Sequence, residues 1–429
     1  MPSGSNLLST NVFIRLVNIG LRGSSLLAKF LLIFLLAYYL TPKEVAIYGL
    51  LVATISYSIY VIGFDFYVYT TRELLGSRSD EWLRMLRDQS VFTVIVYSII
   101  LPLLVFLFVA DLLPWNLAPW FFVLLVFEHL AQELNRLLVA MSRQLYASIA
   151  HFLRSGVWVL VVAVIFWLYP EFRTLEVVLM AWAVGGALAC SMGFMAIARL
   201  DRGCLKKSID WKWLAQGVKI ALPLLFATLA IRALFTVDRY WLEVVGGAEA
   251  LAAYVLFAGV ANAVTSFLDA GVFVFLYPKI VRAFQVKDLT MFESGMKSLF
   301  RQTVIVALIM CVAAAVLINP VLMEIGKEVY FDHVKILYVL LFAMFLFAVS
   351  MIPHYGLYAM GKDKSIIYSN VFSVFVFLGL GLLLTKAFPV LGIPVSLCGS
   401  FFAMLVLKAF FYYRLKRLMT VRFGCEKSY

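Results

Sequence analysis

The chain has 429 residues, of which 64% are hydrophobic and only 14% carry a charge. A soluble protein of this length could not bury so much apolar surface, so the composition excludes a soluble globular fold and indicates a chain embedded in lipid. The net charge of +12 would suggest nucleic-acid binding in a soluble protein. In a membrane protein it is explained by basic loops at the membrane surface, and we expect no nucleic-acid partner.

Twelve apolar segments long enough to cross a membrane follow one another along the chain, with short polar breaks between them. The first six predicted helices are 12–40, 45–70, 90–110, 116–140, 144–169 and 174–200. The second six are 213–243, 248–278, 297–319, 329–360, 364–388 and 391–414. The sequence therefore predicts an all-α integral membrane protein with about twelve transmembrane helices. We expect two six-helix bundles, residues 1–200 and 213–429, joined by the basic linker 201–212.

Basic residues in the loops, near the helix ends and at the chain ends fall mainly on one side of the membrane. On the side of the linker and of both chain ends there are 23, whereas the opposite loops hold five, namely Lys43, Arg173, Lys327, Lys335 and Lys386. Loops rich in lysine and arginine stay in the cytoplasm. We therefore expect both termini and the linker to be cytoplasmic.

Charged residues inside the predicted helices are the main candidates for function. The eight cations are Arg22, Lys29, Arg136, Arg154, Lys219, Arg232, Arg239 and Lys408, and the five acids are Asp65, Glu128, Glu133, Asp238 and Asp269. An ionisable group in a membrane helix faces the protein interior or a watery cavity, because lipid exposure is costly. The excess of cations predicts an anionic guest.

Five of these cations are expected to line a cavity. Arg15, Arg22 and Lys29 are seven residues apart, so they share one face of the first helix. The same spacing recurs in the seventh helix, and Arg154 lies roughly 15 Å into the fifth, too deep to reach the membrane surface easily. The predicted cavity residues are Arg22, Lys29, Arg154, Arg232 and Arg239. Buried structural ion pairs are the alternative.

The other cations have competing interpretations. Arg136 lies one helical turn from Glu133, so it is either a cavity residue or half of a structural pair. Lys219 and Lys408 lie about two turns from the cytoplasmic ends of their helices. Their side chains are expected to extend to the membrane surface.

Three carboxylates, Asp65, Glu128 and Asp269, are candidates for coupling to protons or sodium ions, or are simply ion-pair partners of the arginines. No phosphate-binding loop, HExxH motif or GxSxG motif occurs, and the loops opposite the basic side are short. The five cysteines are scattered. We therefore expect no enzyme activity, no catalytic residue, no cofactor and no metal.

The two halves begin alike. YYLTPKEVAIYGLL (residues 38–51) and YWLEVVGGAEALAAYVLF (residues 240–257) each carry an aromatic pair and Leu, a short turn, a small residue and then Tyr48 or Tyr254. With six helices in each half, both halves start on the same side of the membrane. Parallel repeats of this kind place a substrate site at the repeat interface.

These turns also carry a family resemblance. TPKEVAIYGL (Thr41–Leu50) resembles the G-P-E-E-F-G-x-Y signature of polysaccharide flippases, and Val237–Val260 resembles the matching second-half pattern. Over essentially its whole length, the chain resembles the Wzx-type O-antigen and polysaccharide flippases of the multidrug/oligosaccharidyl-lipid/polysaccharide (MOP) exporter superfamily. It departs from the signature at Ala46 and Ala252, where the family has glycine.

The resemblance implies a V-shaped pair of bundles enclosing a central cavity in the bacterial inner membrane. It implies that an undecaprenyl-diphosphate-linked oligosaccharide moves from the cytoplasmic to the periplasmic leaflet by alternating access. Membrane lipids and other polysaccharide-assembly proteins are further implied partners. The cations fit this substrate, because arginine binds phosphate oxygens in a bidentate fork and lysine offers a point charge.

Two alternatives remain open. Drug exporters of the same superfamily (MATE transporters) also have twelve helices but handle cationic guests, for which acidic groups in the first helix would be expected. A membrane-embedded polysaccharide polymerase or ligase would share the helix count but usually carries a long periplasmic loop. Lipid II flippases typically have fourteen helices, two more than this sequence predicts.

Overall fold

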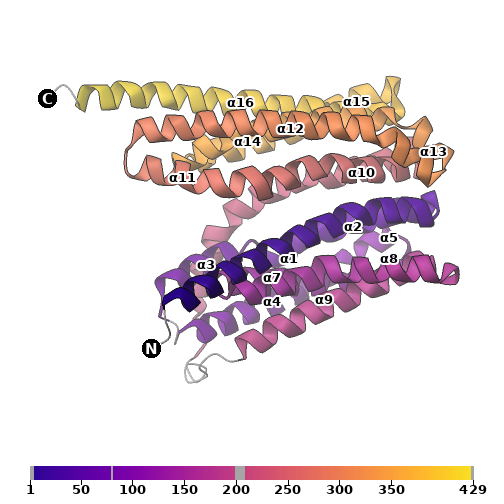
Figure 1. The fold of residues 1–429 in the computed structure, drawn as a ribbon, viewed down its shortest axis with the longest axis horizontal. Coiled ribbons are helices and arrows are strands. Elements are labelled where there is room, and N and C mark those ends of the chain that lie inside the picture. Colours follow the sequence, from indigo (N-terminus) through magenta and orange to yellow (C-terminus); the bar gives the residue numbers. More distant parts are fainter. Residues whose placement is uncertain (1–3, 79–80, 199–207, 427–429) are drawn as a thin grey trace. The chain divides into compact units, whose positions relative to one another are not determined.

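The computed structural model describes residues 4–78, 81–198 and 208–426 (Figure 1). Within these ranges every regular element is a helix, so the all-α prediction is confirmed. Eleven helical segments are long and apolar enough to cross a membrane. One of them, Trp211–Gln285, has 75 residues, far more than the roughly 20 that one crossing needs. It departs from helical geometry at Gly247, where φ is 74°, and is long enough for two crossings, which brings the number in the described part of the chain to twelve.

The chain divides into two compact units, Met1–Leu229 and Ala230–Tyr429. In unit 1, the helices are α1 (Gly4–Tyr39), α2 (Pro42–Gly63), α3 (Tyr67–Gly76), α4 (Trp82–Leu104), α5 (Phe106–Val109), α6 (Ala118–Ala140), α7 (Gln144–Phe152), α8 (Trp158–Leu168) and α9 (Leu175–Ile197). A π-helical turn, Leu153–Val157, joins α7 to α8, and 3₁₀ turns precede α6 and α9 at Trp115–Leu117 and Pro170–Phe172. α6 packs against α9, and α1 packs along α7, the π-turn and α8.

Unit 2 holds most of α10 and all later helices. The elements are α10 (Trp211–Leu268), a π-turn (Asp269–Phe273), α11 (Val274–Gln285), α12 (Leu289–Ile325), α13 (Glu328–Asp332), α14 (Lys335–Ala359), α15 (Asp363–Ala387) and α16 (Pro389–Glu426). α16 packs extensively against both α14 and α15 (Figure 1). The predicted membrane fold of about twelve helices in two bundles is thereby confirmed.

The TPKE sequence of the first-half motif starts α2. The Thr41 hydroxyl accepts the N–H of Glu44 at 3.3 Å, and the Glu44 carboxylate accepts the N–H of Thr41 at 2.9 Å. Pro42 occupies the first helical turn, where its missing N–H costs nothing. This capping box satisfies two backbone groups that the helix end leaves open. The motif therefore has a structural role that its sequence accounts for.

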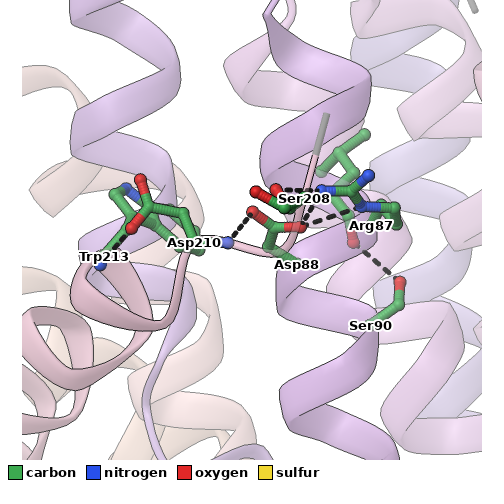
Figure 2. A network of polar contacts seen from close by, with 7 residues as sticks. Arg87, Asp88, Ser90, Ser208, Asp210 and Trp213 are labelled. Atoms are coloured by element: carbon green, nitrogen blue, oxygen red, sulfur yellow. Dashed lines mark hydrogen bonds and ion pairs between the residues drawn. The ribbon is translucent and has the colours of Figure 1, made fainter. Parts of the chain in front are cut away.

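The start of α10 is anchored in unit 1. The ring centroid of Trp213 lies 5.6 Å from that of Phe66 and 5.1 Å from that of Tyr69. Figure 2 shows Asp210 beside α4, where its N–H donates to the Asp88 carboxylate at 3.2 Å. These contacts explain why the boundary between the units falls inside α10. Residues 201–207 of the predicted linker lie outside the described residues, so the predicted limits of the bundles stay a prediction.

The predicted second helix, 45–70, is wrong as one continuous helix. It breaks at Phe64 and Asp65, where φ is 56° and 50°. The Phe64 N–H still bonds the Tyr60 carbonyl and closes the last turn of α2. Aspartate tolerates this left-handed conformation better than most residues. Asp65 therefore lies in a turn between α2 and α3 and not inside a membrane helix.

Other helix limits also differ from prediction. α4 begins at Trp82, eight residues early, and α12 extends from Leu289 to Ile325, beyond both predicted ends. The predicted helix 329–360 is two helices, α13 and α14. Polar first turns and interior prolines such as Pro320 hide these limits, because hydropathy marks only the part of a helix that lies in lipid.

Candidate functional site

The basic face of α1 carries two described cations, Arg22 and Lys29; the side chain of Arg15 lies outside the described residues. Both side chains are exposed. Over the described part of the chain, neither forms a hydrogen bond or an ion pair. Ser25 lies between them on the same face and is buried, with its hydroxyl donating to the Leu21 carbonyl at 2.8 Å. Arg22 and Lys29 therefore keep all their donors for a guest.

The π-turn that carries Arg154 lies directly against this face. A Cβ added to Gly156 would come within 3.4 Å of the Cα of Ser25, which places the turn beside the stretch of α1 between Arg22 and Lys29. Single π-turns inside α-helices are frequent at functional sites, because the extra residue turns side chains away from the regular helical pattern. The structure thus brings three of the predicted cavity residues into one region of unit 1.

Arg154 is paired with a carboxylate. Its Nη2 lies 2.5 Å and its Nε 2.7 Å from Oε2 of Glu128 on α6. The other Glu128 oxygen accepts the indole N–H of Trp182 at 2.7 Å, and Arg154 also donates to the Gln132 side chain at 3.1 Å. Glu128 is buried, so this geometry supplies the partners that a buried charge needs. Arg154 therefore forms a buried structural ion pair, which is the alternative to a place in the cavity.

The region keeps an excess of positive charge. Lys29 interacts electrostatically with both Arg154 and Glu128. His151, at the end of α7, interacts with the same two residues and also with Lys29 and Arg22. Three cations thus face one carboxylate, which favours an anion. The sequence analysis missed His151; its position three residues before Arg154 was the only available signal.

A second polar cluster in unit 1 contains Arg136. The guanidinium pairs with Glu133 at 2.7 Å and lies 3.5 Å from the ring centroid of Tyr67. Glu133 also accepts from the Gln89 side chain at 3.0 Å. The sequence predicts Arg136 either as a cavity residue or as half of a structural pair. The structure shows the i,i+3 pair with Glu133. Asp65 is buried and interacts electrostatically with Glu133.

In unit 2, Arg239 lies beside a buried carboxylate. Its Nη1 is 3.5 Å from Asp238 and also donates to the Phe235 carbonyl. The hydroxyl of Tyr254, the tyrosine of the second-half motif, donates to the other Asp238 oxygen at 2.5 Å. A cavity with room for about one water molecule adjoins this group. Its lining residues are Phe235, Asp238, Arg239, Tyr254, Ala258, Ala261, Asn262, Leu340, Ala343, Met344, Leu397 and Phe401.

Arg232 and Asp269 are the remaining predicted residues of unit 2. Arg232 is partly buried, one helical turn before Thr236, whose hydroxyl donates to the Arg232 carbonyl at 3.0 Å. Asp269 begins the second π-turn and is exposed. Its carboxylate forms no hydrogen bond or ion pair to any residue that the structure describes. Whether Arg232 and Arg239 share one cavity with the cations of unit 1 stays a prediction.

Lys408 on α16 contradicts the prediction that its side chain extends to the membrane surface. The residue is only 1% exposed and ranks among the largest fully buried side chains. Its α14 neighbour His354 interacts with it electrostatically, and Nδ1 of that imidazole is buried without a partner. Among the described residues, Lys408 has no hydrogen bond or ion pair. Hydropathy and spacing missed it because neither reports which face of α16 packs against α14.

Much of the chain matches a known protein family. Residues 15–284 match the pattern of a family described as polysaccharide biosynthesis protein, which is more than half of the chain. The chain belongs to this family. The matched region of the polysaccharide biosynthesis protein includes Arg22, Lys29, Arg154 and the turns of both motif tyrosines, but not Lys408. No curated protein matches the chain.

Solved structures show the fold. An inward-facing multidrug resistance MATE family transporter of the MOP superfamily is 14% identical, with a TM-score of 0.75 over 94% of this chain and 99% of that one. An outward-facing transporter of the same description is 15% identical, with a TM-score of 0.58 over 95% and 96%. A variant of the Vibrio cholerae MATE transporter VcmN is 13% identical, with a TM-score of 0.57 over 96% and 98%. The chain therefore has a MATE-like fold.

Proposed function

We propose that this protein is a flippase that moves an undecaprenyl-diphosphate-linked oligosaccharide from the cytoplasmic to the periplasmic leaflet of the bacterial inner membrane by alternating access. The observation that carries the proposal is the basic face of α1, where Arg22 and Lys29 are exposed and form no ion pair with any described residue. The family description supports the polysaccharide substrate, and the MATE-like fold supports transport.

The cations have distinct roles in this proposal. Arg22 and Lys29 bind the diphosphate, because charge-assisted hydrogen bonds to phosphate oxygens are stronger than neutral ones. Arg154 adds to the positive field while Glu128 and the π-turn fix its position. Arg136 pairs with Glu133 on α6 and lies over the Tyr67 ring of α3, and so falls outside the binding group. The lipid tail stays in hydrocarbon while the diphosphate and sugars enter the protein.

Coupling to protons or sodium ions is assigned to Asp269. Of the three candidate carboxylates, Glu128 is paired with Arg154 and Asp65 is buried in a turn. Asp269 is exposed in a π-turn and is free to bind a proton or a cation. An ion can shift a two-state equilibrium only through its different affinities for the two states. We therefore expect Asp269 to change its surroundings between them.

Transfer of a lipid-diphosphate oligosaccharide between leaflets of proteoliposomes tests the proposed function. A lectin added outside the proteoliposomes detects the sugars that have reached the outer leaflet. Protein-free liposomes are the control. The proposal expects protein-dependent exposure, which an imposed proton or sodium gradient accelerates. A transfer rate that changes with neither gradient would contradict only the assignment of coupling to Asp269. No transfer, combined with efflux of a small cationic drug, would favour the MATE-like exporter; longer glycan products would favour a polymerase or ligase.

A further inference from the structure

His151 is a titratable group for which the proposed function has no role so far. It lies in the last turn of α7, directly before the π-turn that packs against α1. Its side chain is partly buried. Within the described residues the imidazole forms no hydrogen bond or ion pair. Both ring nitrogens are therefore available to a guest.

Charged groups on three of the four elements packed against α7 interact electrostatically with His151. Arg22 and Lys29 come from α1, Arg154 from the π-turn and Glu128 from α6. The fourth element, α9, carries no charged side chain from residue 177 to residue 197. Its nearest titratable group is the Cys190 thiol, which interacts with Glu128 and Arg154. His151 thus lies among three positive charges and one negative charge.

The balance of charge around the imidazole changes when an anion binds. Without a guest, a proton on His151 would add a fourth positive charge to a group with a single carboxylate. A diphosphate joined to a lipid and a sugar carries two negative charges, which together with Glu128 match the three cations. A protonated imidazole then gains an attractive partner and can donate a hydrogen bond to a phosphate oxygen. Histidine is suited to this change because its unperturbed pKa lies near neutral pH, at about 6.5.

We propose that His151 takes up a proton from the surrounding water when the diphosphate binds beside Arg22 and Lys29, so that substrate binding and proton uptake are one event. The inference rests on the proposed function, since it uses the diphosphate as the guest. The proton bonds to a ring nitrogen of His151 and returns to water when the anion leaves. Binding should therefore tighten as pH falls from 8 to 6.

Isothermal titration calorimetry of the full-length protein in lipid nanodiscs tests this. The probe is a polyprenyl diphosphate carrying one N-acetylhexosamine, because such a diester has no titrating group of its own near neutral pH. Titrations at one pH, in two buffers with different ionisation enthalpies, count the protons taken up. We expect wild type to take up about half a proton or more per ligand bound, and His151→Gln to bind more weakly with no uptake. His333→Gln, outside this group of charges, is the matched control and should keep the wild-type uptake.

The other outcomes overturn the inference in distinguishable ways. Wild type that binds the probe without proton uptake, or with an affinity that does not change between pH 6 and pH 8, contradicts the role of His151 and leaves the proposed function intact. Uptake that persists in His151→Gln assigns the proton to another group. Wild type that does not bind the probe contradicts the proposed function and the inference together. Absence of proton uptake in wild type overturns the inference even if the His151→Gln variant does not fold.

Discussion

The charged residues of unit 1 divide into two kinds. Arg154 and Glu128 form a buried pair whose oxygens also accept from Trp182, so its field is partly cancelled. Arg22 and Lys29 form no hydrogen bond or ion pair in the described chain. Removing one member of a buried pair leaves the other uncompensated, whereas removing an exposed charge costs little. Stability and function should therefore be separable by substitution.

Glu128→Gln tests the structural role of the pair. Because Arg154 would lose its counter-charge inside the protein, we expect a loss of about 3 kcal/mol in the free energy of unfolding. Thermal unfolding in detergent measures it. Glu293→Gln is the control, since Glu293 pairs at 2.8 Å with Lys416 on an exposed part of the surface and should cost less than about 1 kcal/mol. Equal losses for both variants would contradict the buried-pair account.

Lys408→Met tests whether the buried amine lowers the stability of the folded protein. A lysine of 1% exposure that lacks an acidic partner pays for lost hydration, and methionine of similar length removes that cost. We expect the melting temperature to rise, by an amount equivalent to at least about 1 kcal/mol. Lys416→Met, at the exposed ion pair, should leave it nearly unchanged. A lower melting temperature for Lys408→Met would show that α16 needs the amine for packing.

Spacing along the chain predicts only some of these contacts. The Arg136–Glu133 pair follows from an i,i+3 spacing on one helix, and the shared face of Arg22 and Lys29 follows from a seven-residue spacing. The partnership of Arg154 with Glu128 joins two helices whose relative rotation no local pattern gives. The burial of Lys408 depends on packing in the same way.

At the scale of elements, the π-turn Leu153–Val157 is held from both sides by small residues. Ser25 of α1 lies against Gly156, and Gly185 of α9 lies so close that an added Cβ would be 2.8 Å from the Leu153 carbonyl oxygen and 2.7 Å from the Trp158 ring. The backbone of the turn cannot move aside as easily as the end of a flexible side chain. Small residues on α1 and α9 therefore set the position of Arg154 and His151.

Gly185→Ala should disturb this packing. The added methyl would press on the backbone of the π-turn, so we expect a lower melting temperature and weaker binding of a lipid diphosphate. Gly23→Ala on α1 is the matched control, since its Cβ would meet nothing within 4 Å. Replacing this helical glycine should raise stability by about 0.5–1 kcal/mol. If Gly185→Ala behaves like Gly23→Ala, the close contact does not exist.

Hydropathy predicts the existence of all twelve crossings but not their breaks. The left-handed turn at Phe64 and Asp65 and both π-turns lie within apolar runs that read as continuous helices. These breaks arise from single backbone angles and from packing, to which hydropathy is insensitive. Each of them holds a candidate residue, namely Asp65, Arg154 or Asp269.

At the scale of the whole molecule, the fold consists of two helical units with α10 belonging to both. Twelve crossings return the chain to the side on which it began. Combined with the 23-to-5 distribution of basic residues in the loops, near the helix ends and at the chain ends, this predicts cytoplasmic termini and a cytoplasmic linker. The orientation decides on which side Arg22 first meets a substrate.

Cys204 in the linker tests the orientation. In a variant whose other cysteines are replaced, a membrane-impermeant thiol reagent should fail to label Cys204 in intact spheroplasts and should label it in inverted vesicles. Lys43→Cys, in the first turn of α2, is predicted on the opposite side and should show the reverse. Labelling of Cys204 in intact spheroplasts would show that the linker lies outside the cytoplasm and would contradict the predicted topology.

The central claim is that the basic face of α1 binds the diphosphate during transfer, and leaflet transfer by the double variant Arg22→Gln/Lys29→Gln tests it most directly. Two charge-assisted contacts are removed, each worth about 1.5 kcal/mol or more, so we predict at least about a tenfold lower transfer rate. Lys43→Gln/Lys335→Gln removes two exposed cations in the first turns of α2 and α14 and should transfer at the wild-type rate. Transfer by the Arg22→Gln/Lys29→Gln protein at the wild-type rate would contradict the account.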